Sequence, residues 1–119
     1  MKKALLSLTT LLLGCHIPNY DTTPAKVELA QCLVREGTMY GTYWCWPCNQ
    51  QKTEFGPEAW KILKGKYVEC SEEGTQKEQQ QCEREGIHIF PTWKFRNGET
   101  FKGYRSDFLY RLAEASGCD

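Results

Sequence analysis

The chain has 119 residues, of which 40% are hydrophobic and 25% charged. This length and composition suit one globular domain with one modest core and exclude two separate domains. Fifteen basic side chains balance fifteen acidic ones, and no basic block alternates with aromatic residues, so we exclude nucleic acid as a partner.

The first residues have the pattern of an export signal. Lys2 and Lys3 are followed by an apolar run from Ala4 to Leu13, and the small residue Gly14 stands directly before Cys15. The run is too short to cross a membrane as a helix, which takes about 20 residues. The segment "LLGC" resembles the bacterial lipobox, in which the chain is cut before a cysteine whose sulfur carries a diacylglycerol. We therefore predict a lipoprotein signal peptide at 1–14 and lipidation of Cys15; the alternative is an ordinary cleaved signal with a chance cysteine.

A short tether at 15–23, without hydrophobic periodicity, leads to a predicted domain at 24–119. In the first element of this domain, Thr23 can cap a helix that has Pro24 at its first position, where a missing N–H costs nothing. Apolar residues recur at helical spacing after it, and Gly37 ends the pattern.

The segment 38–44 is rich in β-favouring residues and carries no charge, which predicts a strand covered on both faces. From Cys45 the sequence favours a helix that Gly56 and Pro57 interrupt. We therefore expect either one kinked helix or two abutting helices before a second short strand at 66–70.

The rest of the chain predicts a helix, a hairpin and a last helix. Thr75 can cap a polar helix, and Asn97-Gly98 is a strong signal for a hairpin whose first strand has Pro91 at its start. Ser106 can cap a final helix with one apolar stripe. The order α-β-α-β-α-β-β-α predicts an α/β fold with a mixed central sheet of about four strands and helices on both faces.

Cys45 and Cys48 form a Cys-X-X-Cys motif at a junction between strand and helix. The free N–H groups and the positive end of a helix start favour the thiolate of the first cysteine, which is the form that attacks disulfides. The second cysteine, one turn further, is close enough to displace a bound partner and close an internal disulfide. We therefore predict that Cys45 is the nucleophile and Cys48 the resolving cysteine. Pro47 suits the first turn of the helix.

The stretches "YWCWPC" and "FPTWKFRNGETFKGY", with the order of elements between them, make the chain similar to the thioredoxin superfamily over about 24–117. More narrowly, "MYGTYWCWPCNQQKTEFG", "YVEC" and "GIHIFPTWKFRNGETFKGYRS" resemble the thioredoxin-like domain fused to or paired with bacterial vitamin K epoxide reductase homologues. The resemblance implies a thioredoxin-like fold, disulfide exchange with exported proteins, and reoxidation by the membrane enzyme with quinone. It also implies a cis bond before Pro91, client backbone pairing along Phe90, and substrate-binding roles for Trp44, Trp46, Pro47, Phe90, Pro91 and Thr92.

Two departures from the family bear on the mechanism. Met39 stands where thioredoxins have a buried aspartate that relays protons, so transfer would go through water or another group such as Glu54. Trp46-Pro47 replaces the Pro-His typical of the epoxide reductase partners and lacks the histidine that would hold the thiolate. Proline in the second slot occurs in thioredoxin and in envelope reductases used for cytochrome maturation. Potentials of such dithiols run from about −270 to −120 mV; we favour oxidation or isomerisation, with the envelope reductase as the alternative.

Other interpretations of the two cysteines are weaker. A zinc site takes four ligands, usually in two close pairs, but no second Cys-X-X-Cys follows and the two histidines are His16 and His88. A copper carrier could add His88 to the cysteines, although it usually has three residues between them. An inert disulfide across two residues would stabilise little. We expect no metal and no bound cofactor, and keep a non-catalytic thioredoxin-fold binding or metal-carrying protein as an alternative.

Four more cysteines belong to the predicted domain. Cys70 and Cys82 bracket its most polar segment, and the resemblance, which brings extra cysteines there, favours a structural disulfide over a second redox pair. The spacing of Cys32 and Cys118 does not determine whether they form a disulfide, so two possibilities stay open: they pair with each other or they stay free.

Together these patterns predict a membrane-anchored thiol–disulfide oxidoreductase in the bacterial cell envelope, held by its lipid on the extracytoplasmic side. Its expected partners are cysteine-containing exported proteins, a vitamin K epoxide reductase-like membrane enzyme, and the membrane through the lipid anchor.

Overall fold

The computed structural model describes residues 19–119, so the signal peptide predicted at 1–14 and the lipidation site Cys15 lie outside the described residues. The elements follow the predicted order: α2 (Thr23–Glu36), β1 (Gly37–Gly41), α3 (Trp46–Leu63), the 3-10 turn η1 (Lys64–Lys66), β2 (Tyr67–Glu69), α4 (Gln76–Arg84), β3 (Thr92–Phe95), β4 (Thr100–Lys102) and α5 (Phe108–Ser116). The strands form one sheet in the order β2-β1-β3-β4. Because β1 runs parallel to β2 while β3 runs antiparallel to β1 and β4, the predicted mixed α/β sheet is confirmed.

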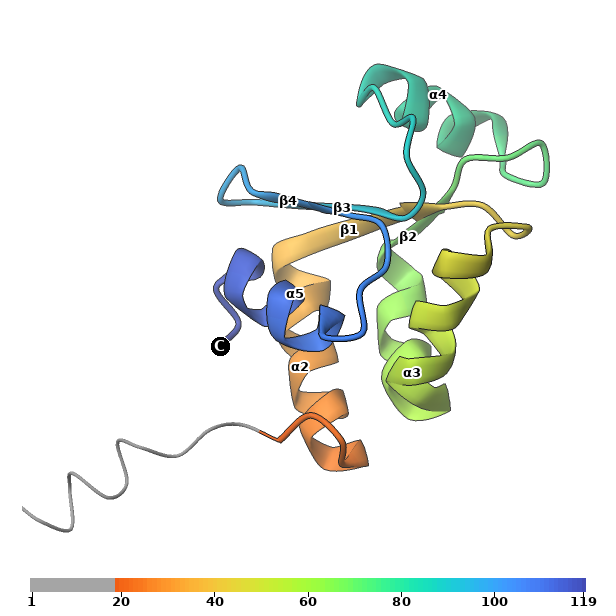
Figure 1. Cartoon of the computed structure of the whole chain (residues 1–119). Coiled ribbons are helices and arrows are strands. Elements are labelled where there is room, and N and C mark those ends of the chain that lie inside the picture. The colour runs from red at the N-terminus through yellow and green to blue at the C-terminus, as the bar shows by residue number, and fades with distance from the viewer. Residues whose placement is uncertain (1–18) are drawn as a thin grey trace, which may run out of the picture.

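Helices cover both faces of this sheet: α2, α3 and α5 lie on one face and α4 lies on the other (Figure 1). Successive side chains of a strand point to opposite faces, and β1 shows the consequence. Met39 is in register with Trp93 and belongs to the larger core, whereas the next residue, Tyr40, packs with Val68 and Cys82 in a smaller cluster. The expected helices on both faces are confirmed.

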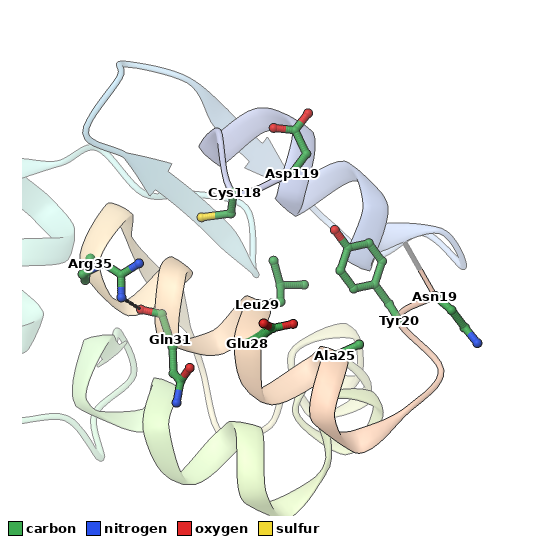
Figure 2. A pocket seen from close by; sticks show the side chains of 9 residues that line it. All are labelled: Asn19, Tyr20, Ala25, Glu28, Leu29, Gln31, Arg35, Cys118 and Asp119. Carbon is green, nitrogen blue, oxygen red and sulfur yellow. Dashed lines mark hydrogen bonds between the residues drawn. The ribbon is translucent and has the colours of Figure 1, made fainter. Parts of the chain in front are cut away.

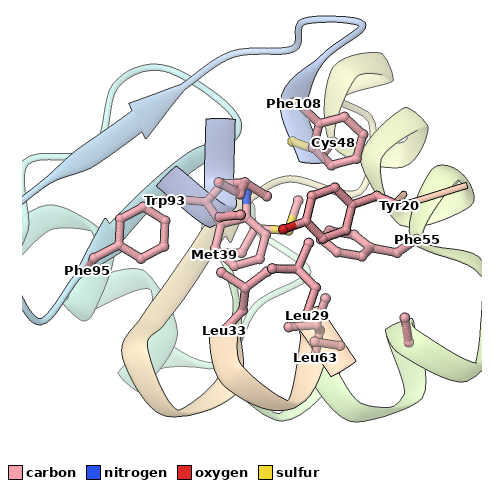
Figure 3. Packing of buried hydrophobic residues seen from close by; sticks show 14 of the residues in the cluster. Tyr20, Leu29, Leu33, Met39, Cys48, Phe55, Leu63, Trp93, Phe95 and Phe108 are labelled. Atoms are coloured by element: carbon pink, nitrogen blue, oxygen red, sulfur yellow. The ribbon is translucent and has the colours of Figure 1, made fainter. Parts of the chain in front are cut away.

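The larger core forms where α2, α3 and α5 meet the sheet (Figure 3). Its largest fully buried side chains include Trp93, Phe55, Phe108, Leu33 and Met39. Gln51 is a polar residue in this core. The Trp93 Nε1–H donates to Gln51 Oε1 at 2.9 Å, and Gln51 Nε2–H donates to the Gly103 carbonyl at 3.0 Å. The buried amide therefore ties α3 to β3 and to the segment after β4.

Helix α3 is one element with a break at Gly56, where φ is 86° and ψ is 164°. Pro57 causes the break, because it lacks an N–H and disfavours the helical conformation in the residue before it. Glycine adopts the positive φ without steric cost. Two helical segments therefore abut at Gly56, where the backbone is not helical, and together they make up the kinked element α3.

Two predicted boundaries near the start of the domain are wrong. The strand predicted at 38–44 ends at Gly41, because the chain turns there to lead into α3. Helix α2 is capped by Thr22, whose hydroxyl accepts a hydrogen bond from the Ala25 N–H at 3.4 Å, while Thr23 is already its first helical residue. Either threonine could have served as the cap by sequence.

The predicted cap of the last helix is also wrong. Ser106 lies in a turn, and Asp107 holds the N-cap position of α5 without a side-chain cap bond. The Asp107 carboxylate instead accepts hydrogen bonds from Arg105 and Arg111, both at 3.1 Å. The cap predicted at Thr75 is present, with a complete capping box at the start of α4.

Two disulfides join elements of the described part of the chain. One joins Cys70, directly after β2, to Cys82 in α4 across a separation of 12 residues, which is the pairing that was predicted. The other joins Cys32 in α2 to Cys118 behind α5 across 86 residues, which decides the question that the spacing left open. Among residues 19–119, the structure contains no helix with the length and apolar character of a membrane span.

Candidate functional site

The sulfur of Cys45 lies at the start of α3. Cys45 is the N-cap of this helix, and its Sγ accepts a hydrogen bond from the backbone N–H of Cys48 at 3.2 Å. Pro47, in the first turn, has no N–H to satisfy. Since the first N–H groups of a helix lack partners within it and carry its positive end, this position stabilises negative charge on the Cys45 sulfur.

Cys48 stands one turn further along α3 and is fully buried. Both cysteines are free thiols, and the Cys48 thiol donates to Cys45 Sγ with the two sulfurs 2.6 Å apart. Burial first, and then this hydrogen bond, raise the pKa of Cys48 to about 12, against smaller lowering effects from the backbone of Thr42 and the charge of Lys52. Cys48 therefore keeps its proton at neutral pH, and an internal disulfide can form with little movement of either side chain.

The loop before β3 lies against the same sulfur. The Cys45 thiol donates to the Phe90 carbonyl at 3.4 Å, and the Phe90–Pro91 peptide bond is cis. Thr92, which was expected to contact substrate, is buried, and its hydroxyl donates to the Ile89 carbonyl at 2.6 Å. Phe90 is thus brought to Cys45 although it lies 45 positions later in the chain.

Four exposed side chains with large apolar surfaces stand within two positions of Cys45 or Phe90 in the sequence, and we call them the apolar rim: Tyr43, Trp44, Trp46 and Ile89. Their exposed fractions run from 49% to 64%, whereas large apolar side chains usually pack into a core. The Trp44 ring meets Phe90 edge to face at 6.2 Å between centroids. Trp44 and Trp46 were predicted; Tyr43 and Ile89 were not, because exposure cannot be read from residue type.

Glu69, at the end of β2, anchors the turn that carries the cysteines. Its carboxylate accepts hydrogen bonds from the backbone N–H of Tyr43 at 3.1 Å, from the backbone N–H of Ser71 at 3.2 Å, and from the Tyr67 hydroxyl at 2.9 Å. Glu69 is half-buried, and these three hydrogen bonds hold the chain on either side of its carboxylate. Sequence reasoning missed Glu69, and the only available signal was an acidic residue between the apolar positions of a short predicted strand.

A lysine that sequence reasoning also missed lies beside the buried cysteine. The Lys52 ammonium sits 4.0 Å from the ring centroid of Tyr67 and 5.2 Å from that of Trp60. Burial lowers the pKa of Lys52, while the nearby Cys48, Glu69 and Cys45 raise it. Lys52 follows Cys48 by four positions, a helical spacing that places both on one side of α3.

The position at which thioredoxins have a proton-relaying aspartate is apolar in this chain. Met39 is almost fully buried in the larger core. Glu54, the group suggested as a substitute, accepts a hydrogen bond from Gln50 at 3.1 Å and hydrogen-bonds Tyr104, whose pKa it raises. It is not among the groups that act on the pKa of Cys48.

Within residues 19–119, no group of three or more His, Cys, Asp or Glu side chains is placed to hold a metal ion; His16 lies outside the described residues. A cavity of about 700 Å³ lies elsewhere, between α2 and the C-terminal residues (Figure 2). Tyr20, Leu29 and Cys118 are among its lining residues, and neither Cys45 nor Cys48 is. The cavity is therefore separate from the cysteine pair.

No protein-family model matches the chain. The chain is 41% identical over 101 residues to the thiol-disulfide oxidoreductase LTO1 of Arabidopsis thaliana. The fold is thioredoxin-like. The match covers 82% of this chain and 26% of LTO1, so the chain spans about a quarter of the length of this relative. The fold and the relative together fit the thioredoxin superfamily.

Proposed function

We propose that the chain is a thiol–disulfide oxidoreductase that exchanges disulfides with cysteine-containing exported proteins. The observation that carries the proposal is the free pair of sulfurs at the start of α3, with Cys45 capping the helix and Cys48 buried behind it. The similarity to LTO1, a thiol-disulfide oxidoreductase, supports the same chemistry. The reaction requires no bound cofactor, because sulfur supplies both the nucleophile and the leaving group.

Exchange would proceed in two steps. The Cys45 thiolate attacks one sulfur of a client disulfide, the other client sulfur leaves with the bonding electron pair and takes up a proton, and a mixed disulfide results. Cys48 then loses its proton and attacks Cys45 Sγ, which releases the second client sulfur as a thiol and closes the internal disulfide. Read backwards, the same steps transfer a disulfide to a reduced client. We favour this oxidising direction, or isomerisation.

The apolar rim offers the surface on which a client would lie. An extended client segment would pair its backbone with Phe90, and the exposed Trp44 and Trp46 rings would cover apolar side chains next to its cysteine. Pro91 and Thr92 would shape the loop rather than touch the client, since both are buried. Such a surface recognises unfolded chain rather than one folded partner.

We place this activity outside the cytoplasmic membrane of a bacterium, with the chain anchored through a lipid on Cys15. Support comes from the lipobox-like "LLGC" and from the two disulfides, which are typical of oxidising compartments. A vitamin K epoxide reductase-like membrane enzyme would reoxidise the cysteine pair. Incorporation of labelled fatty acid into the wild type and not into Cys15→Ser tests the anchor.

The exchange itself is tested with a disulfide-bonded peptide and purified protein. We expect turnover in the wild type and none in Cys45→Ser. Cys48→Ser should accumulate mixed disulfides that can be identified after trapping in cells. Full turnover by Cys45→Ser would contradict the proposal and favour a non-catalytic binding protein.

A reductase of the cytochrome-maturation type is the second candidate, because Pro47 and the absence of a histidine between the cysteines suit a reducing dithiol. The equilibrium potential of the Cys45/Cys48 pair against glutathione separates the two directions. A potential near about −270 mV would favour the reductase, and one toward about −120 mV the oxidant.

A further inference from the structure

The side of Cys48 that faces away from solvent is bounded by β1 and β2. A methyl group on Gly41 would lie 2.9 Å from Cys48 Sγ, 3.0 Å from the Tyr67 ring and 3.2 Å from the Tyr67 hydroxyl. The bare α-carbon of Gly41 therefore lets Cys48 and Tyr67 approach each other. The Lys52 ammonium lies on that same ring, at 4.0 Å from its centroid.

The charged and polar groups that face Cys48 come from three segments. Cys45 at the N-cap of α3, Lys52 within α3 and the backbone of Thr42 in the turn after β1 act on Cys48 directly. Glu69 from β2 acts on the Lys52 ammonium by its charge, and the Tyr67 ring from β2 lies under that ammonium. The Tyr67 hydroxyl donates to Glu69 Oε1 at 2.9 Å. This hydrogen bond fixes the ring on which the ammonium rests, and the Glu69 carboxylate adds an attraction for it.

The balance between the effects that favour and those that oppose a thiolate on Cys48 changes when a client is bound. In the reduced pair, Cys45 opposes a thiolate on Cys48 by its hydrogen bond and its charge. In the mixed disulfide, Cys45 is a neutral disulfide sulfur, so both effects vanish. Burial then still opposes the Cys48 thiolate, and the groups that favour it are the Thr42 backbone and the charge of Lys52. Met39, which is buried at the position where thioredoxins have an aspartate, is apolar and adds no charge.

We propose that Lys52 is a positioning residue for the second step of exchange: its ammonium stabilises the Cys48 thiolate as that sulfur attacks, and the Tyr67–Glu69 pair holds the ammonium in place. The inference rests on the proposed function. In this step the Cys45–Cys48 bond forms and the bond between Cys45 and the client breaks. The Cys48 sulfur is oxidised, while the client sulfur leaves with the electron pair and ends as a thiol, taking up one proton for the one that Cys48 lost. In the oxidising direction, Lys52 stabilises Cys48 as the leaving thiolate.

The test mixes reduced protein with excess oxidised glutathione and follows tryptophan fluorescence. The first phase, which depends on glutathione concentration, reports the attack by Cys45, and the second, which does not, reports ring closure by Cys48. Lys52→Met keeps the length of the stem and removes the charge. Removing one nearby positive charge raises a thiol pKa by about one unit, while the thiolate that still forms is about threefold more nucleophilic. We therefore expect closure near pH 7 to slow about threefold and its pH profile to move upward by about one unit.

Three comparisons make the result specific to the charge. Lys52→Arg should restore closure, and Lys61→Met, an exposed lysine on the same helix, should leave it unchanged. The first phase should change less than the second, because the charge of Lys52 acts more strongly on Cys48 than on Cys45. If Lys52→Met does not fold, Lys52→Gln tests the same loss of charge.

Unchanged closure in Lys52→Met, equal slowing in Lys61→Met, or failure of Lys52→Arg to restore closure would each overturn the inference and leave the proposed function standing. A wild-type protein that oxidised glutathione does not oxidise, with neither phase observed, would overturn the proposed function and this inference with it. The two failures are therefore distinguishable in one experiment.

Discussion

The two disulfides should differ in how much they stabilise the fold, and the difference follows from where each one lies in the chain. The perturbation is a pair of double variants, Cys32→Ala/Cys118→Ala and Cys70→Ala/Cys82→Ala. Neither touches the free cysteine pair. Alanine keeps an apolar atom at each position without adding a hydroxyl that would need a hydrogen-bond partner.

The magnitude comes from the entropy of the unfolded chain. A cross-link removes loop freedom from the unfolded state, by an amount that grows with the logarithm of the loop length. For the separation of 86 residues this gives about 4.6 kcal/mol at 25 °C, and for the separation of 12 residues about 2.8 kcal/mol. Removing the long link should therefore lower the free energy of unfolding by about 1.8 kcal/mol more than removing the short one.

Urea unfolding without reductant, followed by fluorescence and by circular dichroism, measures the difference. The variant without the Cys32–Cys118 link should have the lower midpoint and the steeper dependence on urea, because its unfolded state is more expanded. An equal or greater loss from removal of the Cys70–Cys82 link would refute the loop-entropy argument. It would mean that the short disulfide acts mainly through native contacts in the smaller cluster.

Three further predictions concern the site and its support. Gly41→Ala should cost about 1–3 kcal/mol in urea unfolding and slow ring closure, because the new methyl group would crowd Cys48 Sγ; unchanged closure would show that the sulfur has room to move. Gln51→Leu should cost about 2–3 kcal/mol, since it leaves the buried indole N–H of Trp93 without its acceptor; a neutral result would contradict that bridge. Glu78→Gln should cost about 1 kcal/mol at pH 7. Backbone N–H donors lower the pKa of the Glu78 carboxyl from its ordinary 4.5, so the difference should be full above about pH 4.5 and disappear as the pH falls through the lowered pKa; a difference that persists at pH 2 would refute this reasoning.

The short disulfide also supports the functional site. Cys70 follows Glu69 directly, and its backbone N–H donates to the Gly41 carbonyl at 2.8 Å. The Glu69 N–H in turn donates to Glu78 Oε2 at 2.9 Å. The Cys70–Cys82 link to α4 thus helps to hold Glu69, whose carboxylate anchors the turn before Cys45. In this way the disulfide supports the cysteine pair.

Features that depend on a few neighbouring residues could be predicted. The capping threonine at 75, the hairpin at Asn97-Gly98, the break at Gly56 and the helix start at Cys45 are all set by contacts within about four positions. The physics of a cap, a turn or a missing N–H acts over that range. Where two equivalent residues stand side by side, as at Thr22 and Thr23, local chemistry does not choose between them.

The sequence alone therefore determined the order of elements, the class of sheet and the pair of sulfurs at a helix start, because each follows from local backbone preferences. Only the tertiary structure decided the pairing of Cys32 with Cys118, the return of Phe90 to Cys45, and the meeting of Lys52 with the Tyr67 ring. Those contacts join positions that strand order and helix packing bring together, and the free energy that selects them is shared across the whole core.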